Sequence, residues 1–246
     1  MNFESYTHYG HNIGRNMSIN RYGYAGKPFL VFPSSGGSHN EYADFGMIEA
    51  CQAWIDNGKL QFFTLSSYDD QSWLSNKSGH DMALAQQAYD RYFIEEALPL
   101  IKHVSNWMDP MGATGCSMGA YHAINTFLNH PDVIDTVIAL SGVYDVRYFM
   151  KGYQDDFEIY HNSPVDFLWG QNDPWFIDHY RQGDIIVCTG LGPWEEDGLP
   201  SFYSLKAAFE CKQIPAWFDT WGEDVAHDWP WWRKQMPYFL QVLYPL

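Results

Sequence analysis

Residues 111–123 read Met-Gly-Ala-Thr-Gly-Cys-Ser-Met-Gly-Ala-Tyr-His-Ala, and the rest of the chain is organised around them. Gly115, Ser117 and Gly119 form the pattern G-x-S-x-G, in which a serine lies on a sharp strand-to-helix turn and small neighbours let the backbone pass. We therefore take Ser117 as a candidate nucleophile. Because the pattern is short, the prediction depends on whether the flanking sequence supplies a strand before the turn and a helix after it.

Both flanking elements are predicted. A short strand leads into the turn, and residues 118–129 have the pattern of a helix that ends at His130-Pro131. Further apolar runs typical of buried strands alternate with helical patterns along the chain, at residues 28–33, 60–65, 133–140, 184–189 and 216–221. This alternation predicts an α/β fold with a mostly parallel central sheet and helices on both faces. Residues 3–24 contain two turn signals and predict an antiparallel pair of strands at the edge of the sheet.

Helical patterns are expected at residues 42–54 and 82–107, and Pro99 within the second should kink it or divide it into two helices. At 246 residues and 28.5 kDa, the chain fits one domain over residues 1–246. The segment 144–182 has no clean period and many aromatic residues, which favours an insertion that could act as a lid.

Composition excludes several classes of function. The formal charge is −16, which repels the phosphates of nucleic acids and the surface of anionic membranes. No window approaches the roughly 18 apolar residues of a membrane helix, and no secretion signal opens the sequence. Four cysteines lie far apart without metal-site spacing and are expected as reduced thiols, which favours the cytoplasm. The sequence leaves a homo-oligomer open.

A serine hydroxyl needs a histidine to accept its proton and a carboxylate to orient that histidine. His227 follows the last predicted strand and precedes a final helix, which makes it the candidate base. Between Ser117 and His227 in chain order comes the acidic loop Glu195-Glu196-Asp197, after the strand at 184–189. Glu195 lies nearest the strand end and is the preferred acid, with Asp197 and Glu196 as alternatives.

Several other acids and histidines near these loops are expected to lie outside the catalytic triad. We expect Asp224 and Asp228 to be local loop partners or surface charges. His122, one helical turn after Ser117, should pack beneath the turn, while His39 and His80 lie in loops that could line the mouth of a site.

Acyl transfer also requires hydrogen-bond donors for the developing oxyanion. One should be the backbone N–H of Met118, the residue after the nucleophile. The second should come from the loop after the strand at 28–33, at Ser35, with Gly36 as the alternative. Cys116 occupies the variable position of the motif and is assigned no chemistry.

Aromatic residues make up 18% of the chain and include 11 tryptophans. A tryptophan-rich core explains most of this enrichment. Trp73, Trp175 and Trp194 lie in predicted loops, which also suggests a pocket for a sugar or aryl group.

Together these residues resemble the putative esterase family of α/β-hydrolases, which includes esterase D-like thioesterases, feruloyl and acetylxylan esterases, enterochelin esterases and mycolyltransferases. The resemblance rests on Gly-Cys-Ser-Met-Gly-Ala-Tyr-His-Ala at 115–123 and on the segment 227–232, His-Asp-Trp-Pro-Trp-Trp, which is similar to the family's H-x-W-x-x-W signature. It implies Ser117 as nucleophile and His227 as base. Two positions depart from the family pattern: Pro33-Ser34 stands where His-Gly is common, and Ala120 where a second glycine is common.

The leading hypothesis is a serine hydrolase that cleaves a small-molecule carboxylic ester through an acyl-enzyme, without a metal or organic cofactor. An acyltransferase would use the same residues with a sugar or lipid hydroxyl as acceptor in place of water. A noncatalytic binding or assembly protein on a hydrolase fold is the alternative from another class.

Overall fold

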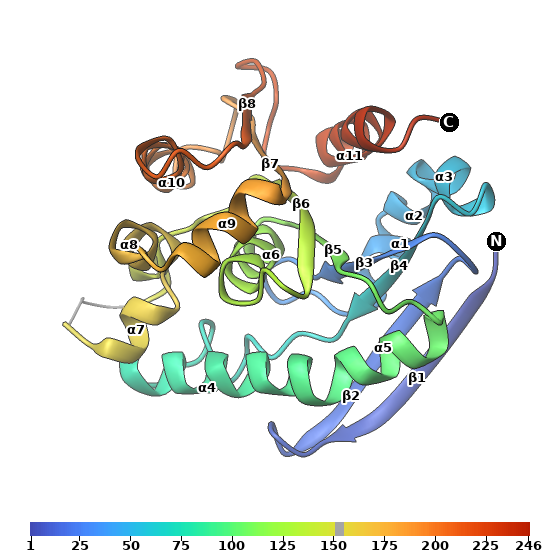
Figure 1. The fold of residues 1–246 in the computed structure, drawn as a ribbon, viewed down its shortest axis with the longest axis horizontal. Helices are drawn as coiled ribbons and strands as arrows, with labels where there is room; N and C mark the ends of the chain where they lie inside the picture. Colours follow the sequence, from blue (N-terminus) through green and yellow to red (C-terminus); the bar gives the residue numbers. More distant parts are fainter. Residues whose placement is uncertain (151–154) are drawn as a thin grey trace.

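The computed structural model describes residues 1–150 and 155–246, and within these ranges eight strands form one mixed sheet (Figure 1). The strands are β1 (Phe3–Gly10), β2 (Arg15–Tyr22), β3 (Lys27–Phe32), β4 (Leu60–Leu65), β5 (Met111–Cys116), β6 (Ile134–Leu140), β7 (Asp184–Thr189) and β8 (Trp217–Thr220). Their order across the sheet is β1-β2-β4-β3-β5-β6-β7-β8.

The sheet has an antiparallel edge and a parallel body. β1 pairs antiparallel with β2, and β2 pairs antiparallel with β4, as expected for the N-terminal segment. From β4 to β8 every neighbouring pair is parallel. The carboxyl ends of these parallel strands therefore meet at one edge of the sheet, where open α/β sheets bind their ligands.

Helices cover both faces and connect the strands. The α-helices are α1 (Glu41–Asp44), α2 (Met47–Ala50), α3 (Gln52–Asp56), α4 (Gly79–Tyr92), α5 (Leu98–Ser105), α6 (Met118–Asn129), α7 (Phe157–His161), α8 (Pro164–Gly170), α9 (Pro174–Gln182), α10 (Leu199–Cys211) and α11 (Trp229–Leu243). A π-helical turn, η1 (Phe93–Ala97), joins α4 to α5, and a short 3-10 helix, η2 (Val146–Phe149), follows β6.

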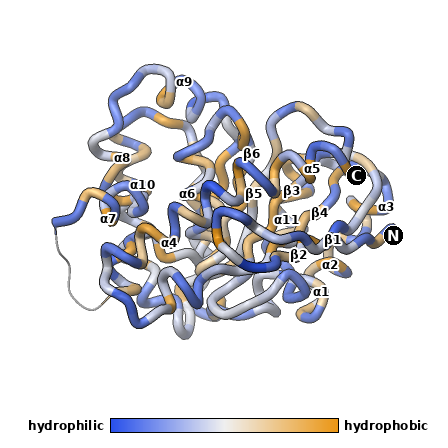
Figure 2. The backbone as a smooth tube through the Cα atoms, turned by 90° about the horizontal axis from the view of Figure 1, so that it is seen from below, coloured by the Kyte–Doolittle hydropathy of each residue, from blue (hydrophilic) through white to orange (hydrophobic). Residues whose placement is uncertain are grey.

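Alternation along the strands produces two cores. Phe29 and Val31 of β3 face a cluster formed with α1–α3 and α11, whereas Leu30 and Phe32 face the cluster formed with α4–α6 and α8–α10. In Figure 2 the hydrophobic colour is concentrated on the central strands and the hydrophilic colour on the outer loops. One sheet lies between the two clusters. That residues 1–246 form one domain stays a prediction.

The helical prediction for residues 42–54 is wrong in detail. The segment forms three short helices instead of one, and Gly46 between the first two has φ = 73°. A residue in the left-handed region cannot continue a right-handed helix, so the chain turns there. At Pro99 the backbone stays helical, and the change from α4 to α5 takes the form of the π-helical turn at Phe93–Ala97, after which Pro99 lies in the first turn of α5. That Pro99 kinks the segment stays a prediction.

The segment 144–182 supplies the connection from β6 to β7 and contains η2 and the helices α7 to α9. Residues 151–154, which belong to the predicted lid, lie outside the described residues. α8 packs against α6 and α10, so this part of the segment belongs to the covering of the sheet. None of the helices in the described ranges combines the length and apolar character that crossing a bilayer demands.

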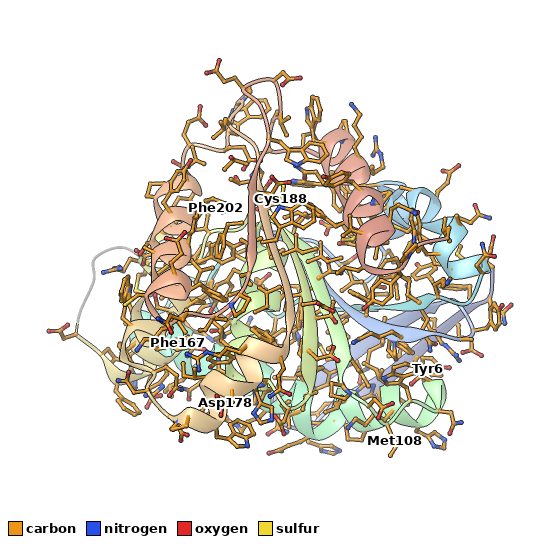
Figure 3. All side chains as sticks on the ribbon, turned by 45° about the horizontal axis from the view of Figure 1, so that its top comes forward. Tyr6, Met108, Phe167, Asp178, Cys188 and Phe202 are labelled. Atoms are coloured by element: carbon orange, nitrogen blue, oxygen red, sulfur yellow. The ribbon has the colours of Figure 1, made fainter. Side chains whose placement is uncertain are left out.

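The four cysteines are free thiols. Cys51, Cys116 and Cys188 are buried and Cys211 is exposed. Figure 3 shows Cys188 in the interior, in contrast to Met108 at the periphery. Burial raises the pKa of each of the three interior thiols. They are therefore protonated at neutral pH.

Candidate active site

Ser117 lies at the turn between β5 and α6 with φ = 56° and ψ = −121°. These angles are rare for a residue with a side chain, and such strain persists only when the surroundings enforce it. One constraint is the Ser117 N–H, which donates to the carbonyl oxygen of Leu140 at the end of β6 over 2.9 Å. The strand-turn-helix context predicted from the motif is therefore present.

The two motif glycines are required by sterics. A Cβ on Gly119 would lie 2.2 Å from the carbonyl oxygen of Phe32, at the end of β3. A Cβ on Gly115 would lie 2.4 Å from the carbonyl carbon of Gly119. The first turn of α6 therefore rests directly on the neighbouring strand ends, which fixes Ser117 beside the loop that follows β3.

His227 lies in the loop between β8 and α11, and its Nδ1 is 3.2 Å from Oε2 of Glu195. The Glu195 side chain is 1% exposed, whereas that of His227 is 22% exposed. The backbone N–H of His227 donates to the carbonyl oxygen of Pro193 over 3.0 Å, which connects the loop that carries the histidine to the loop that carries the acid. The ring of Trp232 packs edge-on against the imidazole at 5.0 Å.

The Glu195 carboxylate has further partners that keep it in place. Oε1 accepts hydrogen bonds from Oγ of Ser141 at 2.6 Å and from the N–H of Gly190 at 3.2 Å. Oε2 accepts from Oγ1 of Thr189 at 3.2 Å in addition to facing His227. Ser141 in turn accepts a bond from Nε1 of Trp232 at 3.0 Å. These donors satisfy both oxygens of the buried carboxylate and fix its orientation.

A pocket of about 280 Å³ joins the predicted residues. Ser117, His227, Met118 and Ser35 all line it. The remaining lining residues are mainly apolar or aromatic and come from three loop regions: Leu74, Val143, Tyr148, Phe149, Trp194, Asp197 and Gly198. Asp197 is the only acidic side chain among them, and no lysine or arginine lines the described pocket.

Two candidate oxyanion donors lie on this pocket. Met118 is the first residue of α6, and the first N–H groups of a helix have no intrahelical partner. Ser35 is exposed in a turn after β3 that is closed by a 2.9 Å bond from the N–H of Gly37 to the carbonyl oxygen of Ser34. Gly36, the alternative donor, has φ = 71° as the third residue of this turn.

The alternative acids lie elsewhere. Asp197 accepts a bond from the Tyr148 hydroxyl at 3.0 Å and faces the pocket, and Glu196 is exposed to solvent. The hydrogen bond to Asp197 raises the pKa of Tyr148, followed by the effect of burial. The structure thus brings Glu195, of the three acids, to His227. Asp228 caps α11 through the N–H of Trp229, in line with its expected local role.

The other histidines do not line the pocket. His122 is buried beneath the turn as expected, and its Nε2 lies 2.8 Å from Oδ1 of Asp69. His39 bonds the hydroxyl of Ser66, and His80 bonds a carboxylate in the segment after β6. The expectation that His39 and His80 line the mouth of the site is therefore not met.

Of the three tryptophans expected in loops, only Trp194 lines the pocket. Trp73 is 1% exposed and packs edge-on against Tyr121, because the loop folds back over α6. Trp175 is exposed on α9 beside His179. Trp194 is 75% exposed and has φ = 66°, a second strained position at the pocket.

Sequence reasoning missed three residues that support the site. Ser141 and Thr189 bond Glu195, and Glu41 bonds Ser34 in the loop that carries Ser35. Ser141 directly follows β6 and Thr189 ends β7, so the position of small polar residues at strand ends was the available signal. Within the described ranges, no three His, Cys, Asp or Glu side chains are arranged to hold a metal ion.

A serine at a sharp turn after β5, an acid after β7 and a histidine after β8, all at the carboxyl edge of a mostly parallel sheet, define an α/β-hydrolase. Residues 43–241 match the family described as Putative esterase, and the chain belongs to this family. It is therefore a carboxylic ester hydrolase.

Solved structures with the same fold cover nearly the whole chain. A ferulic acid esterase has a TM-score of 0.76 at 15% identity, over 98% of this chain and 97% of that one. An S-formylglutathione hydrolase from Agrobacterium tumefaciens has a TM-score of 0.77 at 14% identity, over 98% and 93%. A ferulic acid esterase from Anaeromyces mucronatus in complex with ferulic acid has a TM-score of 0.70 at 12% identity, over 99% and 91%. The sequence has no significant match among curated proteins.

Proposed function

We propose that the protein cleaves its ester through an acyl-enzyme on Ser117. In this mechanism the Ser117 hydroxyl oxygen attacks the carbonyl carbon of the ester and its proton passes to Nε2 of His227. The tetrahedral intermediate collapses, and the alcohol leaves with the proton that His227 returns. Water then attacks the acyl-enzyme with His227 again as the base, which releases the acid and regenerates Ser117.

The observation that carries this proposal is the contact between Nδ1 of His227, which lines the pocket together with Ser117, and the buried carboxylate of Glu195. With the proton on Nδ1 directed to Glu195, Nε2 on the opposite side of the ring is free to accept a proton. Glu195 then orients the imidazole and stabilises the imidazolium that forms. Its remaining hydrogen bonds, including that from Ser141, keep the carboxylate from turning away.

Oxyanion stabilisation is assigned to two backbone groups, the N–H of Met118 and the N–H of Ser35. Both residues line the pocket, and they belong to segments that Gly119 holds in close contact. Pro33-Ser34 replaces the His-Gly common in the family, so the second donor depends on the turn at Ser34–Gly37.

The substrate is proposed to be a small uncharged ester with an aryl or sugar group. Trp194 and Tyr148 supply flat surfaces on which such groups stack, and the neighbour bound to ferulic acid is consistent with an aryl acid. Asp197 on the pocket wall disfavours an anionic substrate. Four free cysteines fit a reducing compartment, and we propose the cytoplasm as the location.

Steady-state kinetics on p-nitrophenyl acetate tests the assignment. Ser117→Ala and His227→Ala should each reduce kcat by at least ~10³-fold, as removal of one triad member does in related chemistry. Parent-like kcat in both variants would overturn the proposal. Product analysis with added sugar and long-chain alcohols distinguishes hydrolysis from acyl transfer, since the acceptor ester would replace the free acid.

A further inference from the structure

A second buried carboxylate, Glu41, lies behind the loop that carries the proposed oxyanion donor. Glu41 is 7% exposed and is the first residue of α1. Its Oε2 accepts the N–H of Ser34 at 2.8 Å, and its Oε1 accepts the Ser34 hydroxyl at 2.5 Å. Both donors belong to the residue immediately before Ser35. The carboxylate therefore binds one end of the peptide segment whose next N–H is the proposed donor.

The turn is shaped around this carboxylate. A Cβ on Gly37 would lie 2.2 Å from Oε1 of Glu41, so the acid fills the space behind the turn. The N–H of Glu41 itself donates to the carbonyl oxygen of Ser38 over 3.0 Å, which closes the loop from the other side. Glu41 therefore holds the loop at two points: its side chain binds Ser34, and its backbone N–H binds Ser38.

Glu41 is in turn fixed by its neighbour. Tyr42 is 1% exposed and packs edge-on against Phe62 of β4 at 6.0 Å and against Trp229 at 5.9 Å. Trp229 follows His227 by two residues, so the helix that carries Glu41 rests on the segment that carries the base. The position of the carboxylate is therefore set by the core and not by the exposed loop.

An ionised carboxyl at this place is costly. Burial raises the pKa of Glu41, the hydrogen bonds from Ser34 oppose that rise, and the carboxylates of Asp69 and Asp44 add to it. The two hydrogen bonds from Ser34 offset part of this cost, because a buried carboxylate is tolerated where donors satisfy its oxygens. Both donors belong to the loop after β3, which points to a role of the acid in that loop.

We propose that Glu41 is a positioning residue that holds the turn Ser34–Gly37 so that the N–H of Ser35 faces the oxyanion formed on Ser117. The inference rests on the proposed function of Ser117 and Ser35. Without the carboxylate, the peptide at Ser34 is free to turn and the donor leaves its place. Because the oxyanion exists only in the transition state and the tetrahedral intermediate, the loss falls on kcat and leaves KM nearly unchanged.

The test compares Glu41→Leu, which keeps the volume but has no acceptor, with Glu41→Gln, which keeps one acceptor oxygen. Glu41→Leu should lower kcat by ~10- to 10³-fold, since complete loss of one oxyanion donor costs ~10²- to 10³-fold and a displaced donor costs less. Its KM should stay within ~2-fold of the parent value, since ground-state binding is unaffected. Glu41→Gln should recover most of the lost kcat. A purely structural role would not produce this division between kcat and KM or the rescue.

A trifluoromethyl ketone provides a second measurement, since Ser117 adds to its carbonyl carbon and the new oxyanion occupies the same site. Its inhibition constant should rise in Glu41→Leu by about the factor by which kcat falls. The matched control is Glu96→Gln. Glu96 likewise holds a turn through the backbone N–H groups of His11 and Asn12, but at the β1–β2 connection, so parent-like kcat and inhibition are expected.

Gly37→Ala keeps the test decisive if Glu41→Leu does not fold, because its methyl group displaces the carboxylate while leaving Glu41 in the sequence. It should also lower kcat without changing KM. The inference is overturned if folded Glu41→Leu or Gly37→Ala retains parent kcat and parent inhibition. The proposed function fails separately, if Ser117→Ala keeps the parent rate or the ketone does not inhibit the parent protein.

Discussion

Glu195 and His227 are joined by a 3.2 Å contact in which the acid is buried and the histidine remains accessible from the pocket. This asymmetry suits a pair in which one member only orients and the other exchanges protons. Glu195→Gln keeps the size of the side chain but presents an amide to the imidazole, which disturbs the tautomer.

We expect Glu195→Gln to lower kcat by ~10²- to 10⁴-fold with little change in KM, following the effect of the same change in other triads. The measurement is steady-state hydrolysis of p-nitrophenyl acetate, with Glu196→Gln as the control because that neighbouring acid is exposed to solvent. Equal losses in the two variants would show that the effect does not come from the contact with His227.

Gly119, in the first turn of α6, and Gly36, in the loop after β3, differ in the space available for an added methyl group. Gly119→Ala places a methyl group against the carbonyl oxygen of Phe32 and should destabilise the fold by about 3 kcal/mol or more, because backbone cannot move aside cheaply. Gly36→Ala meets nothing within 4 Å and should cost about 1 kcal/mol, from its positive φ alone. Urea unfolding of both variants checks the order, and a smaller loss for Gly119→Ala would contradict the steric account.

Trp194 should determine preference for aryl esters. Trp194→Ala keeps the strained backbone but removes the flat surface at the pocket, and we expect kcat/KM for an aryl acid ester to fall by about 2- to 10-fold, the value of one aromatic contact. For the acetate ester of the same alcohol, kcat/KM of Trp194→Ala should equal that of the parent protein. Trp175→Ala, which removes an exposed tryptophan away from the pocket, is the control, and an aryl-specific loss there as well would refute a local role for Trp194.

The cysteines should react unequally with a thiol reagent. Burial raises the pKa of Cys51, Cys116 and Cys188 and removes them from contact with the reagent, so the native protein should show one fast thiol, Cys211. Denaturation should reveal all four. Titration with Ellman's reagent measures this, and fast modification of Cys116 in the folded protein would mean that the turn at Ser117 opens.

Much of the fold follows from patterns that are local in sequence. Apolar runs of strand length predict the parallel body, and a tyrosine- and glycine-containing hairpin predicts the antiparallel edge. The division of residues 41–56 into three helices was missed: Gly46, in the left-handed region, separates the first two helices, and Cys51, with φ = −99° and ψ = 6°, separates the second from the third.

The residues of the candidate site that could be predicted are those whose position after a strand is visible in the sequence. Ser117, Glu195 and His227 each follow a strand, and the carboxyl ends of parallel strands lie at one edge of the sheet. Ser141 and Glu41 were missed because their roles arise from contacts across the fold or across a loop. The burial of Trp73 was missed for the same reason, since a loop position says nothing about how the loop folds back.

Detection of the acyl-enzyme itself tests the role of Ser117 without an intermediate step. The protein is mixed with p-nitrophenyl acetate, quenched with acid during the first turnovers and digested for peptide mass spectrometry. An acyl-enzyme mechanism on Ser117 requires one acetyl group on Ser117 and no acetylated peptide from Ser117→Ala. Continued hydrolysis by the parent with no adduct on Ser117, or with the acetyl group on another residue, would contradict it.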